Sequence, residues 1–149
     1  MSKLIIHTDG GSRGNPGPSA IGAVITDEQG SILLSQGKFI GKATNNQAEY
    51  QAVIFALQNA KGIFKKTKVR KLEIELYMDS ELVCKQLNHQ YKIENNNIQP
   101  LFLKVWNLML DFDKVSFFNI PREKNKQADK LVNQAMDQQT KNRLLNLFL

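Results

Sequence analysis

Five short segments of the chain have the apolar patterns of β-strands, and the clearest of them alternate apolar and polar residues. They are residues 3–9, 21–27, 32–40, 72–78 and 114–120. A glycine- and proline-rich turn over residues 10–18 separates the first two. The sequence Asp27-Glu28-Gln29-Gly30 is a hairpin signal between the second and third. We therefore expect an antiparallel meander of three strands at the start of the chain.

Four other segments repeat apolar residues at helical spacing. In the clearest, residues 44–64, Thr44 followed by Gln47 fits a capping box. Its predicted buried stripe is Ala52, Val53, Ala56, Leu57, Ala60, Ile63 and Phe64. The other predicted helices cover residues 80–87, 98–110 and 126–138. The order β-β-β-α-β-α-α-β-α predicts an α/β fold, a mixed sheet with helices packed on its faces.

Four acidic residues occupy positions that packing alone does not explain. Asp9 and Asp79 end predicted strands, and Asp129 lies in the first turn of the last helix. Glu49 precedes Ala52 and Val53 by three and four residues, so it falls on the apolar stripe of its helix. If the two strands are parallel neighbours, Asp9 and Asp79 emerge at one carboxyl edge of the sheet. Glu49 and Asp129 can reach the same edge.

Gathered carboxylates are costly unless something positive is held between them. A ligand set made only of oxygen suits hard cations such as Mg²⁺ or Mn²⁺. The single cysteine cannot form a zinc site, and no P-loop or Ser/His/acid spacing is present. The sequence therefore indicates a site for divalent cations.

Composition narrows the class of protein further. A chain of 149 residues fits one domain, which we expect to cover residues 1–149. The lone Cys84 favours a reducing, cytoplasmic setting, and the apolar runs are too short to span a membrane. The formal charge of +6 favours a polyanionic partner. We expect a monomer.

Two segments keep alternative interpretations. Six basic residues gather at the end of one helix and in the following turn: Lys61, Lys65, Lys66, Lys68, Arg70 and Lys71. This basic cluster is either a solvated connector or a patch that binds successive phosphates of a nucleic acid. The apolar tail, residues 144–149, either docks on the core, which we favour, or contacts a partner.

The chain resembles type 1 ribonuclease H, the single-domain nuclease of RNA/DNA hybrids, from end to end. The motifs that carry the resemblance are TDGGSRGNPG (8–17), TNNQAE (44–49), the pair Asp79-Ser80, and Asn125 with Asp129 four residues later. Each motif is degenerate, but their order and spacing are specific. The short loop before the last acid is similar to that of archaeal and some bacterial members.

The resemblance implies a five-stranded mixed sheet of order 3-2-1-4-5, with strand 2 antiparallel. It implies that Asp9, Glu49, Asp79 and Asp129 are catalytic and bind two Mg²⁺ ions in the presence of substrate, with Mn²⁺ as a substitute. The implied reaction is in-line hydrolysis of the RNA strand, which leaves 5′-phosphate and 3′-hydroxyl ends. The RNA strand would be distinguished from DNA by its 2′-hydroxyl groups.

The resemblance also implies contacts with the nucleic acid. The RNA strand would meet the Gly11 backbone, Asn15, Asn45, Asn46 and Glu49, and a pocket for a phosphate of the DNA strand would comprise Lys42, Thr44 and Asn95. Ser80, Arg122 and Asn125 complete the predicted substrate-binding set. Arg122 stands where many members have a loop histidine, and it either serves turnover or pairs with a surface acid.

Three functions remain open at this point. The first is an endonuclease specific for RNA/DNA hybrids. The second is a broader nuclease that also cleaves double-stranded RNA. The third is a catalytically silent nucleic-acid-binding module, which the intact acidic quartet disfavours because a pure binder gains nothing from four repelling acids.

Overall fold

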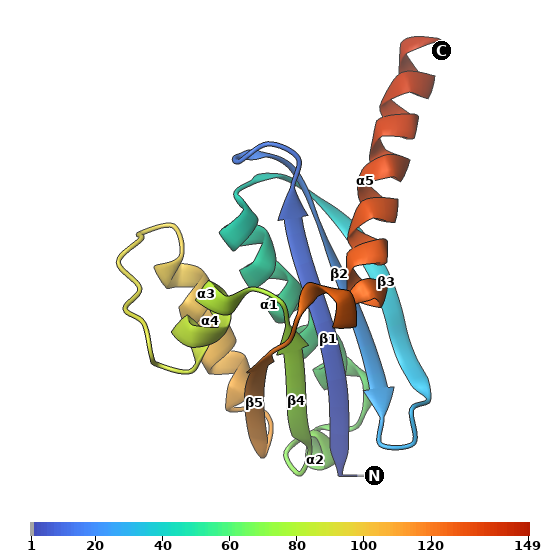
Figure 1. Ribbon diagram of the computed structural model, residues 1–149. Coiled ribbons are helices and arrows are strands. Elements are labelled where there is room, and N and C mark those ends of the chain that lie inside the picture. The colour runs from blue at the N-terminus through green and yellow to red at the C-terminus, as the bar shows by residue number, and fades with distance from the viewer. Residues whose placement is uncertain (1) are drawn as a thin grey trace.

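The computed structural model describes residues 2–149, in which five strands form one sheet of order β3-β2-β1-β4-β5 (Figure 1). The antiparallel meander is β1 (Lys3–Ser12), β2 (Gly17–Asp27) and β3 (Ile32–Ala43). The next strand, β4 (Glu73–Met78), runs parallel to β1, and β5 (Lys114–Asn119) runs parallel to β4. The predicted strand order and the antiparallel second strand are therefore confirmed.

Helices cover both faces of this sheet. A Cβ added to Gly10 would meet Ala48 of α1 (Asn45–Ile63), whereas one added to Gly11 would meet Val132 of α5 (Lys126–Leu147). Consecutive strand residues point to opposite faces, so α1 and α5 lie on opposite sides of β1. On the α1 side, α3 (Glu81–Leu87) and α4 (Gln99–Met109) pack against α1.

The main core lies between the sheet and α1. Leu4 and Ile6 of β1 are fully buried there, together with Val53 and Leu57 of α1. A smaller apolar cluster on the other face joins α5 to β2 and β3. The capping box at the start of α1 is confirmed: the Thr44 hydroxyl accepts from the Gln47 backbone, and the Gln47 side chain accepts from the Thr44 backbone.

The structure corrects three boundaries. The predicted turn over residues 10–18 is largely strand, because β1 continues to Ser12 and β2 begins at Gly17. The last helix was expected to end at residue 138, but α5 continues to Leu147.

Two short helices were not predicted, α2 (Lys66–Val69) and the 3-10 turn η1 (Arg122–Lys124). In the predicted stripe of α1, Ile63 is not buried.

The apolar tail does not dock on the core, contrary to the favoured interpretation. The end of α5 projects away from the sheet (Figure 1), and Leu147 and Phe148 are 78% and 86% exposed.

The basic cluster lies at the other end of the molecule, where α2 sits beside the start of β1 (Figure 1). Lys61 follows Glu49 by twelve residues on α1, which is about 18 Å along the helix axis.

No helix within residues 2–149 combines the length and the apolar character that a membrane span requires.

Candidate active site

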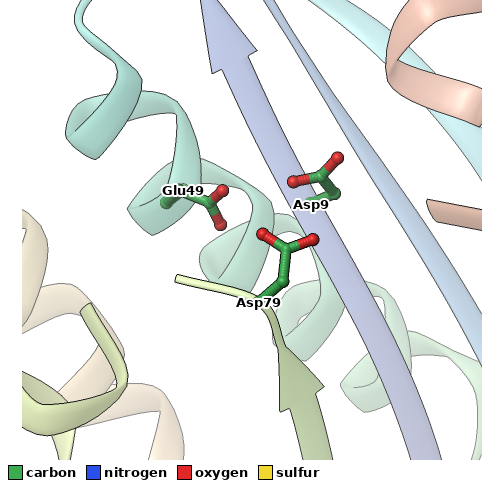
Figure 2. A group of neighbouring side chains, drawn as sticks. All are labelled: Asp9, Glu49 and Asp79. Carbon is green, nitrogen blue, oxygen red and sulfur yellow. The ribbon is translucent and has the colours of Figure 1, made fainter. Parts of the chain in front are cut away.

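Three of the four predicted acids converge where β1, β4 and α1 meet. His7 of β1 pairs with Tyr77 of the parallel β4, so Asp9 and Asp79, each two residues later, come to the same level of the sheet. Glu49 reaches them from the first turns of α1. Figure 2 shows the three carboxylates pointing toward one another, and each offers an oxygen within 4.8 Å of the others.

Gly10 makes this convergence sterically possible. A Cβ at this position would stand 2.3 Å from the Ala48 carbonyl and 2.6 Å from the Glu49 backbone nitrogen. Only glycine lets β1 and α1 approach this closely. The nearby backbone N–H of Gly10 lowers the pKa of Glu49, against the larger effect of burial. Sequence reasoning missed this role, because Asp9-Gly10 is first a turn signal.

Crowding and burial raise the pKa values of Asp9 and Glu49, so these two side chains ionise less readily than usual. Burial raises the pKa of Asp9 from 3.8 to about 7, and the negative charge of Asp79 adds to the effect. Burial raises the pKa of Glu49 well above its ordinary value, again with help from Asp9 and Asp79. Each of these carboxylates would gain from a nearby positive charge.

The donor set fits hard divalent cations. Oxygen atoms are the ligands that such ions prefer. Glu49 Oε2 is buried and has no hydrogen-bond partner among residues 2–149, so a lone pair is left for a cation. The raised pKa values and this unpaired oxygen are what carboxylates arranged to bind a positive ion display.

Asp129 lies farther from the centre than the other acids. It is half-buried near the start of α5 and lines the same cavity, of about 400 Å³, but it does not belong to the group held within 4.8 Å. Five predicted substrate-binding residues also line this cavity: Gly11, Asn45, Asn46, Ser80 and Arg122. Asn133 of α5 and Arg13 of the β1–β2 loop line it too; neither was predicted as a site residue, although Arg13 lies within the motif TDGGSRGNPG.

Asn125 does not lie where a substrate contact requires. It is 1% exposed, and its side-chain amide donates to the Thr8 carbonyl at 2.8 Å and to Asp79 Oδ2 at 3.1 Å. Its position indicates that it orients the Asp79 carboxylate rather than touching nucleic acid. Ser80 caps α3, accepting from the Val83 backbone at 3.3 Å, while still lining the cavity.

Asn15 and Asn45 join the β1–β2 loop to the start of α1. The Asn45 backbone donates to Asn15 Oδ1 at 3.0 Å, and the Ser12 backbone donates to Asn45 Oδ1 at 2.9 Å. Their side-chain NH₂ groups donate no hydrogen bond within residues 2–149. The loop is therefore fixed against α1 while both amides keep a donor for a ligand.

A smaller cavity of about 210 Å³ lies beside α1. It brings together Asn15, Thr44, Asn46 and Asn95, although Asn95 is distant in sequence. Lys42, the other predicted member of the phosphate pocket, lines two neighbouring cavities instead. The juxtaposition of Thr44 and Asn95 agrees with the predicted pocket, and Lys42 lies outside its lining.

Comparisons with known proteins agree with this geometry. The family model described as "Reverse transcriptase-like" matches residues 7–135. Ribonuclease HI of Halobacterium salinarum is 41% identical over 131 residues, 88% of this chain and 63% of that protein. The bifunctional protein Rv2228c of Mycobacterium tuberculosis is 38% identical over 136 residues, 91% of this chain. The chain spans only 36% of that relative and less than two thirds of the halobacterial one.

Solved structures share the whole architecture. The crystal structure of RNase H1 from Halobacterium salinarum has a TM-score of 0.85 at 39% identity, covering 92% of this chain and 99% of that one. LC11-RNase H1, isolated from compost and crystallised in complex with an RNA/DNA hybrid, has a TM-score of 0.87 at 43% identity, with 92% and 99% coverage. From its motifs, fold and relatives, the chain belongs to the type 1 ribonuclease H family.

Proposed function

We propose that this chain is a metal-dependent endoribonuclease that hydrolyses the RNA strand of RNA/DNA hybrids and leaves 5′-phosphate and 3′-hydroxyl ends. The observation that carries the proposal is the convergence of Asp9, Glu49 and Asp79 within 4.8 Å in an open cavity. The hybrid bound to LC11-RNase H1, at 43% identity, supports the choice of substrate.

Asp9, Glu49 and Asp79 would hold the divalent cations, with Asp129 contributing from the side of the cavity. We propose Mg²⁺ as the physiological ion, two per site with substrate, and Mn²⁺ as a substitute. Bound ions would supply a more acidic water and positive charge at the scissile phosphate. The chain's own contribution is to keep the carboxylates gathered: Gly10 lets Glu49 approach Asp9, and Asn125 orients Asp79.

Other residues would position the nucleic acid. Asn45, Asn46 and the Gly11 backbone line the acidic cavity and offer donors to the RNA strand. Glu49, facing that cavity, is placed to accept from a 2′-hydroxyl group, which DNA lacks. Asn15, Thr44 and Asn95 around the smaller cavity would bind a phosphate of the DNA strand, with Lys42 adding charge nearby. Arg122, exposed at the rim, would attract the backbone.

We propose further that the described fold acts as a single catalytic domain and as a monomer. A cytoplasmic location and cleavage of double-stranded RNA stay predictions from the sequence alone.

The decisive assay compares one sequence as an RNA/DNA hybrid, an RNA duplex, a DNA duplex and single-stranded RNA, each with Mg²⁺ or Mn²⁺. Cleavage of the hybrid alone supports the proposal, and equal cleavage of the RNA duplex supports the broader nuclease. Binding without cleavage would identify a silent module and overturn the proposal.

Asp9→Asn tests whether cleavage depends on the acidic cluster. It should abolish cleavage while the protein stays folded, because the amide keeps the shape of the side chain and loses its charge. Asp113→Asn, which changes an exposed acid just before β5, is the control and should leave cleavage unchanged. Undiminished cleavage by Asp9→Asn would remove the acidic cluster from the mechanism.

A further inference from the structure

A cavity of about 380 Å³ adjoins the acidic cavity, and of its lining residues only Lys42 has a role in the proposed function. It lies where the distal half of α5 passes the start of β2 and the end of β3. Arg13 and Met136 line both cavities, so the two are adjacent along α5.

One stripe of α5 forms the floor of both cavities. Asp129, Asn133 and Met136 face the acidic cavity, and Met136, Thr140 and Arg143 face the second. These positions are spaced by four, three, four and three residues, which places them on a single helical face. The family model ends at residue 135, so all four α5 residues that line the second cavity lie beyond the matched region.

The lining combines apolar walls with positive charge. Pro18, Phe39 and Met136 supply apolar surface, and no acidic residue lines the cavity. Arg13 is engaged with Asp137 at 2.7 Å. Lys42 and Arg143, by contrast, have no carboxylate within 4.0 Å in the described part of the chain, so their charge is available to a ligand.

We propose that this cavity binds an unpaired nucleotide of a single-stranded segment that continues from the hybrid in the acidic cavity. This inference rests on the proposed function. An aromatic wall for base stacking and flanking cations for phosphates are what sequence-tolerant single-strand sites use. Phe39 is half-buried against the apolar cluster beside α5, and it also lines the cavity. A duplex hides the faces of its bases, so only an unpaired base can stack there.

The geometry sets the length of the segment. Arg143 follows Asp129 by fourteen residues on one helix, about 21 Å along its axis. A stacked strand rises about 3.4 Å per nucleotide, so roughly six nucleotides separate the two positions.

The experiment measures KM for a blunt RNA/DNA hybrid and for hybrids whose RNA strand carries a 5′ or 3′ tail of about ten nucleotides, longer than the span requires. One of the tails should lower KM by roughly five-fold or more, the effect expected of one stacked base. In Arg143→Ala, which removes a cation beside the ring of Phe39 and leaves the ring itself, the ratio of blunt to tailed KM should fall below the wild-type ratio. Lys141→Ala, which removes an exposed charge two residues away and outside the cavity, is the control and should keep the wild-type ratio.

A second readout does not depend on hydrolysis. Anisotropy of a fluorescein-labelled oligothymidylate, recorded in EDTA, should show weaker binding by Arg143→Ala than by Lys141→Ala. Equal KM values for blunt and tailed hybrids, or a tail effect of wild-type size in Arg143→Ala, would overturn the inference. If no hybrid is cleaved at all, the proposed function fails, and the anisotropy comparison still decides whether single strands bind here.

Discussion

Gly10 on β1 lies so close to Glu49 on α1 that an added Cβ would stand 2.6 Å from the Glu49 backbone nitrogen. This contact sets the separation of strand and helix, and with it the distance between two of the clustered carboxylates. The spacing of the proposed metal site therefore depends on the absence of one side chain.

Gly10→Ala should force α1 away from β1. We expect a loss of about 1–3 kcal/mol in the free energy of unfolding, as for other overpacked sites. Hydrolysis should fall by about 100-fold, because small displacements of catalytic groups are costly. Gly62→Ala is the control: nothing lies within 4 Å of its added Cβ, so it should be neutral or slightly stabilising. Wild-type activity of Gly10→Ala would contradict the steric argument.

Asn125→Ala should weaken the site without touching substrate. The change leaves the Thr8 carbonyl unpaired and Asp79 without its amide donor, for a loss of about 1–3 kcal/mol in stability. Mg²⁺ affinity, measured by titration calorimetry, should fall about 10–100-fold, as for other residues that orient metal ligands. The exposed Asn107→Ala on α4 controls for loss of an amide. An unchanged Mg²⁺ affinity would show that Asp79 needs no orienting partner.

Stability without metal should respond to pH through the acidic cluster. The folded state holds the Asp9 proton more tightly than the unfolded state, since its pKa is raised from 3.8 to about 7. The folded protein therefore binds more protons between these values, and the contribution of the cluster to stability falls as pH rises from about 4 to about 7.

The measurement is the Tm of wild type minus that of the Asp9→Asn/Glu49→Gln variant, followed across this range in EDTA. The difference is needed because Glu28 and Glu75, whose pKa values are lowered by backbone and Lys3 contacts, act in the opposite direction in both proteins. The difference should decrease with pH, and saturating Mg²⁺ should reverse that decrease. A difference that rises with pH in EDTA would contradict the raised pKa of Asp9.

Neutralising the basic cluster should have little effect on hybrid binding. Lys65 and Lys66 lie past the far end of α1, which is about 21 Å from Glu49 along the helix axis, between two and three Debye lengths at physiological salt. Lys65→Ser/Lys66→Ser should leave KM for the hybrid close to wild type, whereas Lys42→Ala should raise it. A large rise in KM for the double variant would restore the hypothesis of a phosphate-following patch.

Deletion of residues 144–149 should leave the fold intact. These side chains are exposed in the structure, so their removal should change the free energy of unfolding by no more than about 0.5 kcal/mol. Thermal unfolding of the truncated protein checks this. A substantial drop in Tm would mean that the tail contacts the domain in solution.

The sequence alone located the five strands, the four longer helices and the acids of the site, although not every boundary. Alternation and helical spacing are local properties, so β4 and the capping box at Thr44 could be located without a structure. Glu49 was conspicuous because a carboxylate on an apolar stripe conflicts with burial unless it has a partner. The family motifs extended the prediction to the strand order, which local patterns do not specify.

Only the tertiary structure decided how closely these groups meet. Gly10 was expected to begin a turn, but pairing with β2 keeps it in a strand, where the approach of α1 requires it. Asn125 was expected to touch substrate, but burial beneath Asp79 gives it an orienting role. The path of α5 beyond residue 138 also depended on packing: it carries Arg143 past Phe39 and leaves the apolar tail in solvent. Such relationships join residues far apart in the chain, and no local pattern contains them.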